Sequence, residues 1–323
     1  MLTINNDTEF QTLINKEFNH NSGLILKNIE FGSNYELHFR KFNIPNVNNI
    51  FAQIRFENCE FKGQAFFSNT IFEYSTTFSN VHAGNSHFDS TVVYGKRAEF
   101  INNVGLIDFW NIKFSESTTF LLEGNYPKNF GIANAGELAY RIAKLQAYKI
   151  GDVNLGDKYY YLERSYRGYQ IMPPISIWDK TKKGYKKFVL FNSIKVDKYY
   201  KFIFPKTKDL ISKYLIGYGE KPFNCIFWML IFILSYSFIY MFTGLKINNE
   251  ITYLLYNPNA SFIESFQSIF DYVFFSIVTF TTVGYGDITT GNLIGKFFAS
   301  TEMILGVTLI GAWTATLLRK LMK

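Results

Sequence analysis

Two long apolar stretches with a glycine-containing hexapeptide between them constrain the fold of this chain most. Residues 223–243 carry no charge, and residues 297–318 carry only Glu302. Since a helix rises about 1.5 Å per residue, each stretch can span the roughly 30 Å hydrocarbon core of a bilayer. Between them, residues 262–280 predict a shorter apolar helix that re-enters the membrane and ends at the hexapeptide. The sequence therefore predicts a membrane protein with two spanning helices.

The hexapeptide Thr-Val-Gly-Tyr-Gly-Asp, residues 282–287, is suited to lining an ion path. A cation that crosses a membrane loses its water, and successive backbone carbonyls can replace that water if they point to one side. Gly284 and Gly286 permit such a backbone, because glycine reaches positive φ without steric cost. Val283 and Tyr285 are expected to point away from the path and brace the loop. The alternative, a strand–turn of a soluble domain, does not explain the apolar flanks.

Residues 222–321 resemble the pore module of two-span potassium channels, through Val-Thr-Phe-Thr-Thr-Val-Gly-Tyr-Gly-Asp at residues 278–287. The resemblance implies a potassium-selective channel that assembles as a homotetramer, since four copies of the loop are needed to surround an ion. K+ is then the permeant ion and no cofactor is expected. The filter residues implied are Thr282, Val283, Gly284, Tyr285, Gly286 and Asp287, with K+ held at the first four and the Thr282 hydroxyl at the inner mouth.

The resemblance continues into the second apolar stretch. Gly295 and Lys296 fit the start of the family's inner helix, and Gly306 fits its hinge glycine. Thr308 and Gly311 also fit family positions. The residues implied to line the pore are Thr281, Ile310, Thr314 and Leu318, of which the last three are spaced by four and share one helix face.

Two departures from the family pattern lie close to the filter. Phe274 and Phe275 occupy positions that often hold tryptophan in the family. Val278 occupies a position that holds glutamate in some members, so Asp287 lacks these usual partners. The carbonyl run itself is intact, and the expected selectivity is unchanged.

Charge is distributed unevenly along the 323 residues. Residues 1–125 hold 9 basic and 13 acidic residues, residues 126–221 hold 19 and 8, and residues 222–323 hold five of each. The basic block, residues 126–221, adjoins the first apolar stretch, and Arg319 and Lys320 follow the second. The positive-inside rule therefore predicts both termini in the cytoplasm and the outer mouth of the filter outside, in the inner cell membrane.

The basic block predicts contact with anionic lipid headgroups. Residues 205–218 predict a short helix whose apolar stripe suits the membrane interface, or alternatively packs on the soluble part. Nucleic-acid binding is another interpretation of such a block, but the membrane is the nearer partner, and no nucleic acid is expected. The candidate lipid-facing residues are Lys206, Lys208 and Lys213.

Aromatic residues recur in the N-terminal third at steps that alternate between five and six, with slips at Ala83 and near Val104. A period near 5.5 fits neither a helix nor a flat strand, but it suits a solenoid in which each short side supplies one inward side chain. Residues 50–121 resemble the pentapeptide-repeat family, which implies a right-handed β-helix; a Phe-rich β-sandwich is the alternative. The recurring residues are Phe56, Phe61, Phe67, Phe72, Phe78, Phe88, Tyr94, Phe100, Phe109, Phe114 and Phe120.

Helices are expected in the basic block. The capping-box spacing of Asn134 and Glu137 predicts a helix over residues 134–151, and residues 154–168 predict a second helix that starts at Asn154. The short turn between them favours an antiparallel hairpin. The remaining residues of the block before residue 205 fit either short strands or an interface segment.

No enzyme site emerges from the sequence. The four histidines show no spacing typical of metal ligands. Cys59 and Cys225 are expected as reduced, buried thiols. The polar N-terminus predicts no secretory signal.

The sequence thus predicts a multidomain membrane protein in three parts. These are a cytoplasmic β-helix over residues 1–125, a basic helical linker over residues 126–221, and an all-α two-span tetrameric pore with a re-entrant helix over residues 222–323. The expected function is passive K+ conduction gated through the N-terminal domain, since the C-terminal sensing domain of two-span prokaryotic channels is not expected after Lys323. The alternative is a sensor module whose β-helix binds an unidentified cytoplasmic partner, with K+ flux as its output; pull-down with the β-helix would separate the two.

Overall fold

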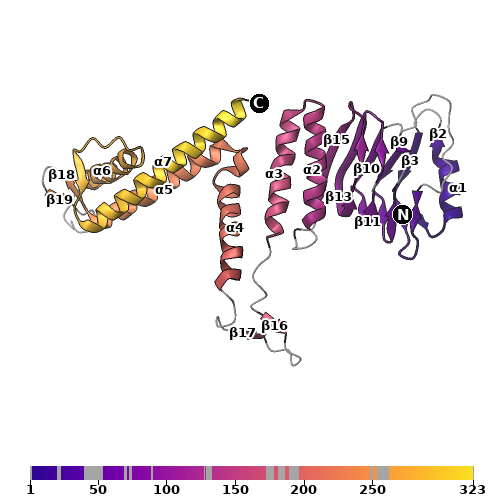
Figure 1. The fold of residues 1–323 in the computed structure, drawn as a ribbon, viewed down its shortest axis with the longest axis horizontal. Coiled ribbons are helices and arrows are strands. Elements are labelled where there is room, and N and C mark those ends of the chain that lie inside the picture. Colours follow the sequence, from indigo (N-terminus) through magenta and orange to yellow (C-terminus); the bar gives the residue numbers. More distant parts are fainter. Residues whose placement is uncertain are drawn as a thin grey trace. The chain divides into compact units, whose positions relative to one another are not determined.

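The computed structural model divides into two units, Met1–Thr207 and Lys208–Lys323, and Figure 1 labels their helices and strands. The structure describes residues 2–19, 23–39, 54–68, 71–72, 75–88, 90–126, 128, 133–171, 178–180, 186–188, 196–247, 250–252 and 262–322.

Parallel strands make up much of the first unit (Figure 1). Among the described residues, twelve strands form one sheet, and β9 (Ile71–Phe72), β12 (Val92–Val93) and β14 (Lys113–Phe114) form another. The pairs in both sheets are parallel except β2 with β3, which contradicts the antiparallel β-sandwich alternative. The twelve strands are β1 (Leu2–Ile4), β2 (Phe18–Asn19), β3 (Gly23–Lys27), β4 (Ile29–Phe31), β5 (Leu37–His38), β6 (Ile54–Glu57), β7 (Glu60–Phe61), β8 (Gln64–Phe66), β10 (Thr76–Ser79), β11 (His82–His87), β13 (Arg97–Asp108) and β15 (Thr119–Asn125).

From β6 onward the strands stack in layers spaced by 22 residues. Phe56 pairs with Phe78, and Phe78 pairs with Phe100. Their rings are stacked, with centroids 4.9 Å apart at both steps. Because each ring removes a large apolar area from water, this column of phenylalanines stabilises the interior. The sequence period near 5.5 is one quarter of the layer spacing.

Asparagines occupy one line of turns between the strands. Asn28, Asn58 and Asn80 have positive φ values of 55°, 53° and 53°, a conformation that asparagine tolerates better than most residues. Asn80 Nδ2 donates to Asn58 Oδ1 at 3.1 Å, and Asn58 Nδ2 lies 3.4 Å from Asn28 Oδ1. This ladder ties successive layers together at their turns. The sequence analysis did not predict this ladder, although Asn58 and Asn80 are 22 residues apart, which equals the layer spacing.

Most of the aromatic residues predicted to point inward are buried. Phe114 is partly buried, and Tyr94 is the one exposed member, with 58% of its surface exposed, while Val93 beside it is 3% exposed. The prediction for Tyr94 was wrong because neighbouring residues of an extended segment face opposite sides, and Val93 of β12 takes the inward side. The buried members are Phe56, Phe61, Phe67, Phe72, Phe78, Phe88, Phe100, Phe109 and Phe120.

Two helices form the predicted hairpin after the strands, and a further helix, α1 (Asp7–Glu17), lies near the N-terminus. The hairpin helices are α2 (Ala133–Lys149) and α3 (Val153–Tyr169), which lie side by side in Figure 1. Asn134 lies inside α2, so the predicted start was late by a residue. Asp152, and not Asn154, caps α3, because its carboxylate accepts a hydrogen bond from Leu155 N at 3.0 Å.

The hairpin closes the C-terminal edge of the large sheet. Tyr140 Oη donates to Gly124 O at 3.0 Å, and Leu122 N donates to Tyr159 Oη at 2.8 Å. Burial raises the pKa of Tyr159 to about 12, so this hydroxyl stays neutral in the cell. The hydrogen bonds satisfy backbone groups of β15 that pair with no further strand in the described residues.

The residues between the hairpin and the second unit combine strand and helix. Strands β16 (Trp178–Lys180) and β17 (Lys186–Phe188) form an antiparallel pair. This pair agrees with the short strands, one of the two alternatives predicted for this segment. Helix α4 (Val196–Tyr214) begins earlier than the predicted residues 205–218. Tyr218, predicted inside that helix, lies instead in the 3-10 turn η3 (Gly217–Gly219).

The second unit contains the three apolar helices that the sequence predicted. They are α5 (Pro222–Thr243), α6 (Phe262–Phe280) and α7 (Leu293–Leu321). In addition, β18 (Leu245–Ile247) pairs antiparallel with both β19 (Glu250–Thr252) and β20 (Ile288–Thr290). By length and composition, α5 and α7 can each cross a membrane.

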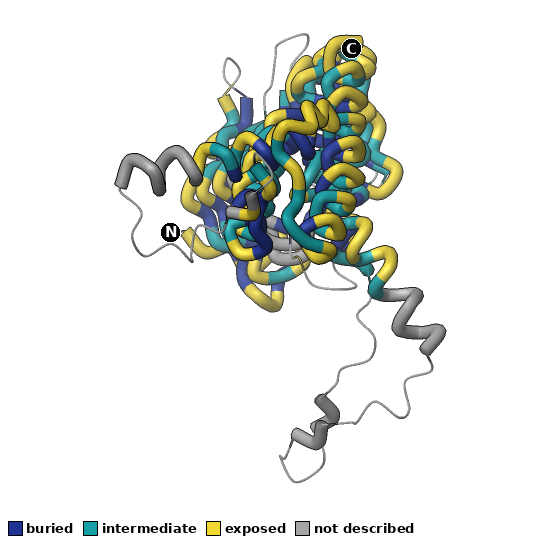
Figure 2. The backbone as a smooth tube through the Cα atoms, turned by 90° about the vertical axis from the view of Figure 1, so that its left-hand side faces the viewer, coloured by how far each residue is buried: buried dark blue, intermediate teal, exposed yellow. Residues whose placement is uncertain are grey.

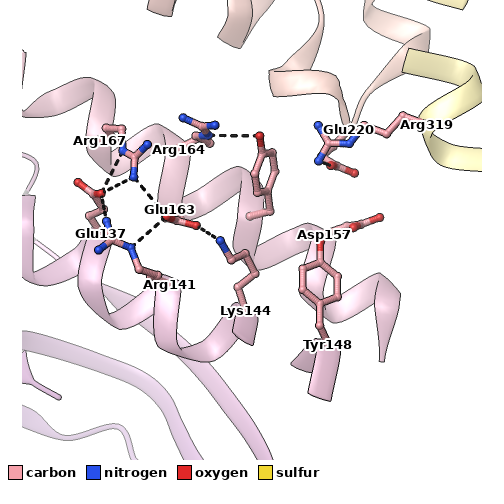
Figure 3. A network of polar contacts seen from close by, with 11 residues as sticks. Glu137, Arg141, Lys144, Tyr148, Asp157, Glu163, Arg164, Arg167, Glu220 and Arg319 are labelled. Atoms are coloured by element: carbon pink, nitrogen blue, oxygen red, sulfur yellow. Dashed lines mark hydrogen bonds and ion pairs between the residues drawn. The ribbon is translucent and has the colours of Figure 1, made fainter. Parts of the chain in front are cut away.

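A buried ion-pair network joins α2 to α3 (Figure 3). Lys144 Nζ lies 2.6 Å from Glu163 Oε2, and Arg167 Nη2 lies 2.9 Å from Glu137 Oε1. Burial raises the pKa of Glu163, but hydrogen bonds and charge from Lys144 and Arg141 outweigh it, so its pKa is lowered overall. The carboxylate form of Glu163 therefore stabilises the hairpin.

We expect the hairpin to loosen in acid through Glu163. A carboxylate whose pKa is lowered by folding stabilises the fold above its unfolded pKa and stops doing so as the pH falls through the folded pKa, which for Glu163 lies below its ordinary range. Glu163→Gln should lower the local opening free energy at pH 7 by about 1–3 kcal/mol and flatten its acid dependence. Hydrogen exchange of the α2 and α3 amides from pH 7 to pH 3, corrected for intrinsic rates, measures both effects.

The matched control is Glu123→Gln, since Glu123 pairs with Lys158 at 3.0 Å on the surface. It should change little, because exposed ion pairs contribute little. If Glu163→Gln keeps the acid dependence of the parent, Glu163 is not the group responsible.

Candidate functional site

The hexapeptide at residues 282–287 is held between a helix and a strand. It begins two residues after the end of α6 at Phe280, and β20 starts directly after Asp287. Val283 N donates to Val278 O at 3.0 Å, and Gly284 N lies 3.4 Å from the same oxygen. The last turn of α6 therefore holds the first residues of the hexapeptide in place.

The backbone of the hexapeptide alternates in the sign of φ. Thr282, Gly284 and Gly286 have φ values of 59°, 56° and 84°. In a regular strand successive carbonyls point to opposite sides, whereas reversal of φ at every second residue turns them toward one side. This is the arrangement that a dehydrated cation requires. The sequence predicted it for the two glycines and missed that Thr282 shares it.

The side chains of the hexapeptide have different surroundings. Tyr285 stacks on Phe274 of α6, with ring centroids 6.1 Å apart and the planes 6° from parallel. Phe274 therefore braces Tyr285 from the position where the resembling family often has tryptophan. Val283 and Asp287 are exposed in the single chain.

The predicted pore-lining residues lie on α7 and at the end of α6. Thr281 and Thr314 are exposed, and each hydroxyl donates to a carbonyl of its preceding turn. Leu318 is also exposed, while Ile310 is half-buried. Figure 2 shows the end of α7, near the label C, as largely exposed.

Gly306 lies where α7 comes closest to α6. A Cβ at this position would be 1.9 Å from the carbonyl oxygen of Phe280 and 2.8 Å from its carbonyl carbon. The absence of a side chain thus lets α7 pack against the last residue of α6. In this structure α7 runs without interruption from Leu293 to Leu321. The hinge role of Gly306 stays a prediction, and close packing is a second reason for a glycine.

Glu302 lies inside the bundle and bonds to two other helices. Tyr240 Oη of α5 donates to Glu302 Oε2 at 2.6 Å, and Ser276 Oγ of α6 lies 2.5 Å from Glu302 Oε1. The sequence reading noted Glu302 only as a lone charge. An isolated acidic residue in a spanning helix was itself the signal, because such residues are costly in a membrane unless they have a role.

A second polar contact ties the end of α7 to the turn before α5. Arg319 Nη2 lies 2.8 Å from Glu220 Oε1, whose side chain is 7% exposed, and Arg319 Nη1 donates to Tyr218 O at 3.4 Å. Tyr218 Oη in turn donates to Asp209 Oδ1 of α4 at 2.8 Å. Gly219 has a φ of 86°, a conformation that residues with a side chain adopt only with strain, so the turn favours glycine there.

The candidate lipid-facing lysines have different surroundings. Lys206 Nζ donates to the carbonyl oxygen of Gly168 at 2.7 Å, which engages it within the first unit. Lys213 lies 5.7 Å from the ring of Tyr214, and Lys208 is exposed. On the same helix, Leu210, Ile211 and Tyr214 are exposed. Lipid contact of these three lysines stays a prediction.

Residues 228–323 match the family model described as "Ion channel". The chain is also similar to a curated protein, potassium channel K1 of Plasmodium berghei (strain Anka), with 32% identity over 97 residues. The aligned segment is 28% of this chain and 5% of that relative, so the chain spans a small part of the relative's length. No solved structure matches the chain.

We expect Gly306→Ala to destabilise the second unit. The added methyl group would overlap the Phe280 carbonyl, and overpacking typically costs about 1–3 kcal/mol. Gly311→Ala is the matched control on the same helix, because a Cβ at Gly311 meets nothing within 4 Å. Thermal unfolding of the full chain in detergent compares them. Equal stability of the two variants would contradict the close packing.

Proposed function

We propose that this chain is a potassium-selective channel that conducts K+ passively as a homotetramer. The observation that carries the proposal is the alternating φ at Thr282, Gly284 and Gly286, directly after an apolar helix that lies between two membrane-length helices. K+ would be coordinated by the carbonyls of Thr282, Val283, Gly284 and Tyr285. The similarity to a protein named as a potassium channel supports the choice of ion.

The exposed apolar surface of the second unit supports assembly. Phe270 of α6 and Ile294, Phe297 and Val307 of α7 are exposed in the single chain, although they lie on the helices that frame the hexapeptide. Four copies around a common axis would place one hexapeptide each around the ion and cover part of this surface. By the positive-inside rule both termini would lie in the cytoplasm.

Gly284→Ala tests the filter. Within the single chain a Cβ at Gly284 meets nothing within 4 Å, but the φ of 56° is one that alanine adopts only with strain. The variant should lose selective K+ current in planar bilayers under bi-ionic K+/Na+ conditions. Gly311→Ala is the control, since it adds the same methyl group in open space without a positive φ. A Gly284→Ala channel as selective as the parent would show that the filter lies elsewhere.

We further propose that the N-terminal part modulates the pore through the turn before α5. Asp209 of α4, Tyr218 of the turn and Arg319 of α7 form a continuous chain of contacts. The Glu220–Arg319 pair anchors the end of α7 to this turn. A displacement of α4 would therefore move the end of α7, the helix proposed to line the pore, through these contacts.

Charge exchange tests this coupling. Arg319→Glu places a second carboxylate beside the nearly buried Glu220, and loss of the partner of such a charge typically costs about 3–5 kcal/mol. Glu220→Arg places a second cation beside the partly exposed Arg319. Each single variant should change single-channel open probability more than tenfold. The double exchange should restore it in large part. Lys320→Glu, the same charge reversal at the exposed neighbour, is the control. The proposed coupling is contradicted if the single variants have the same open probability as Lys320→Glu, or if the double exchange does not restore the open probability of the parent.

For residues 1–125 we propose the right-handed β-helix of the pentapeptide-repeat type. The parallel pairing, the layer spacing of 22 residues and the asparagine ladder support it. An experimental structure of the full chain with antiparallel or left-handed layers in this region would contradict it.

A further inference from the structure

Glu302 has two hydrogen-bond partners on two other helices, and conduction as proposed above does not use it. We propose that Glu302 is a positioning residue that fixes α6 against α7 and so sets the geometry of the filter. The inference rests on the proposed function of the second unit as a selective channel.

The three side chains form a closed site. Tyr240, Ser276 and Glu302 have 0% exposure each, and both carboxylate oxygens of Glu302 have a hydroxyl within 2.6 Å. Ser276 Oγ also donates to Ile233 O of α5 at 2.8 Å. One site therefore connects all three apolar helices of the unit.

Burying these polar groups costs more free energy than a helix contact requires. Taking a carboxyl group and two hydroxyls out of water is costly even when they bond to one another, and apolar side chains of similar volume would often stabilise a helix contact as well. What apolar residues do not provide is a fixed direction and register between the helices. Hydrogen bonds to both oxygens of one carboxyl group provide that.

The contact pattern shows which register is fixed. Ser276 and Phe280 lie one turn apart on α6, and Glu302 and Gly306 lie one turn apart on α7. Glu302 bonds to Ser276, and Gly306 packs on the carbonyl of Phe280. Two contacts along the same pair of helix faces prevent α6 from sliding or rotating against α7.

The position of α6 relative to α7 also determines the position of the filter, which begins within one helical turn of these contacts. Val278, between Ser276 and Phe280, accepts the backbone hydrogen bond from Val283 N. A shift of α6 would therefore move the carbonyls of the hexapeptide directly. Selectivity depends on the position of those carbonyls, whereas membrane insertion does not.

A matched control lies one turn away on α5. Tyr236 Oη and Thr301 Oγ1 of α7 are 3.1 Å apart, so this hydrogen bond also joins α5 to α7 through a tyrosine. Unlike the Tyr240–Glu302 bond, it does not involve the carboxyl group that bonds to Ser276 of α6. Tyr236→Phe therefore removes a comparable bond between the same two helices and leaves the α6 register in place.

The experiment compares Tyr240→Phe and Ser276→Ala with Tyr236→Phe in the full chain, purified as an assembled oligomer and reconstituted in bilayers. The readout is the Na+/K+ permeability ratio from reversal potentials. Loss of one bond to a carboxyl group should raise this ratio on the order of tenfold in the first two variants and leave it unchanged in Tyr236→Phe. Glu302→Gln, which keeps the volume and one acceptor oxygen, should give an intermediate ratio.

The possible outcomes separate the positioning role of Glu302 from the proposed function. Parental ratios in Tyr240→Phe and Ser276→Ala would overturn the positioning role, as would an equal change in Tyr236→Phe, which would reveal a general loss of packing. If Tyr240→Phe does not assemble, Ser276→Ala and Glu302→Gln still give the comparison. A parent that conducts without preferring K+ would instead overturn the proposed function itself.

Discussion

Residues 282–287 expose polar backbone beside two apolar helices, and the second unit is organised by the need to accommodate it. Helices satisfy their own backbone groups, but this hexapeptide cannot, and hydrocarbon offers no substitute. The last turn of α6 accepts its first N–H groups, and β20 takes up the chain directly after it. The remaining carbonyls are left to face one side. The same constraint thus explains the short helix, the small sheet and the glycines.

A row of residues along α7 changes from buried to exposed. Glu302, Gly306, Ile310, Thr314 and Leu318 are spaced by four, while a helix turns once in 3.6 residues, so each step turns the row by about 40° around the helix. The first two residues are buried against α6, Ile310 is half-buried, and the last two are exposed. The row therefore starts on the side that packs on α6 and ends away from it. The sequence could show the spacing, but not where along the row the packing ends.

How much could be predicted depended on the range of the interactions. The apolar helices and the two filter glycines follow from local chemistry, and α6 has the predicted bounds, Phe262–Phe280. The aromatic period indicated stacked layers, because repetition makes distant pairs visible in sequence. The cap at Asp152 and the exposed Tyr94 were missed because competing candidates lie only one or two residues away. The partners of Glu302 were missed because they come from two other helices, and no spacing along the chain brings Tyr240 and Ser276 together.

The hairpin over β15 has a consequence for the behaviour of the protein in a crowded cell. A stack of parallel strands ends in a row of free N–H and C=O groups that can recruit a strand from another molecule. Here Tyr140, Tyr159 and Gln146 bond to those groups or to the turns beside them. The two helices of the hairpin thus cover this end of the stack, and they protect it from joining end to end into fibres.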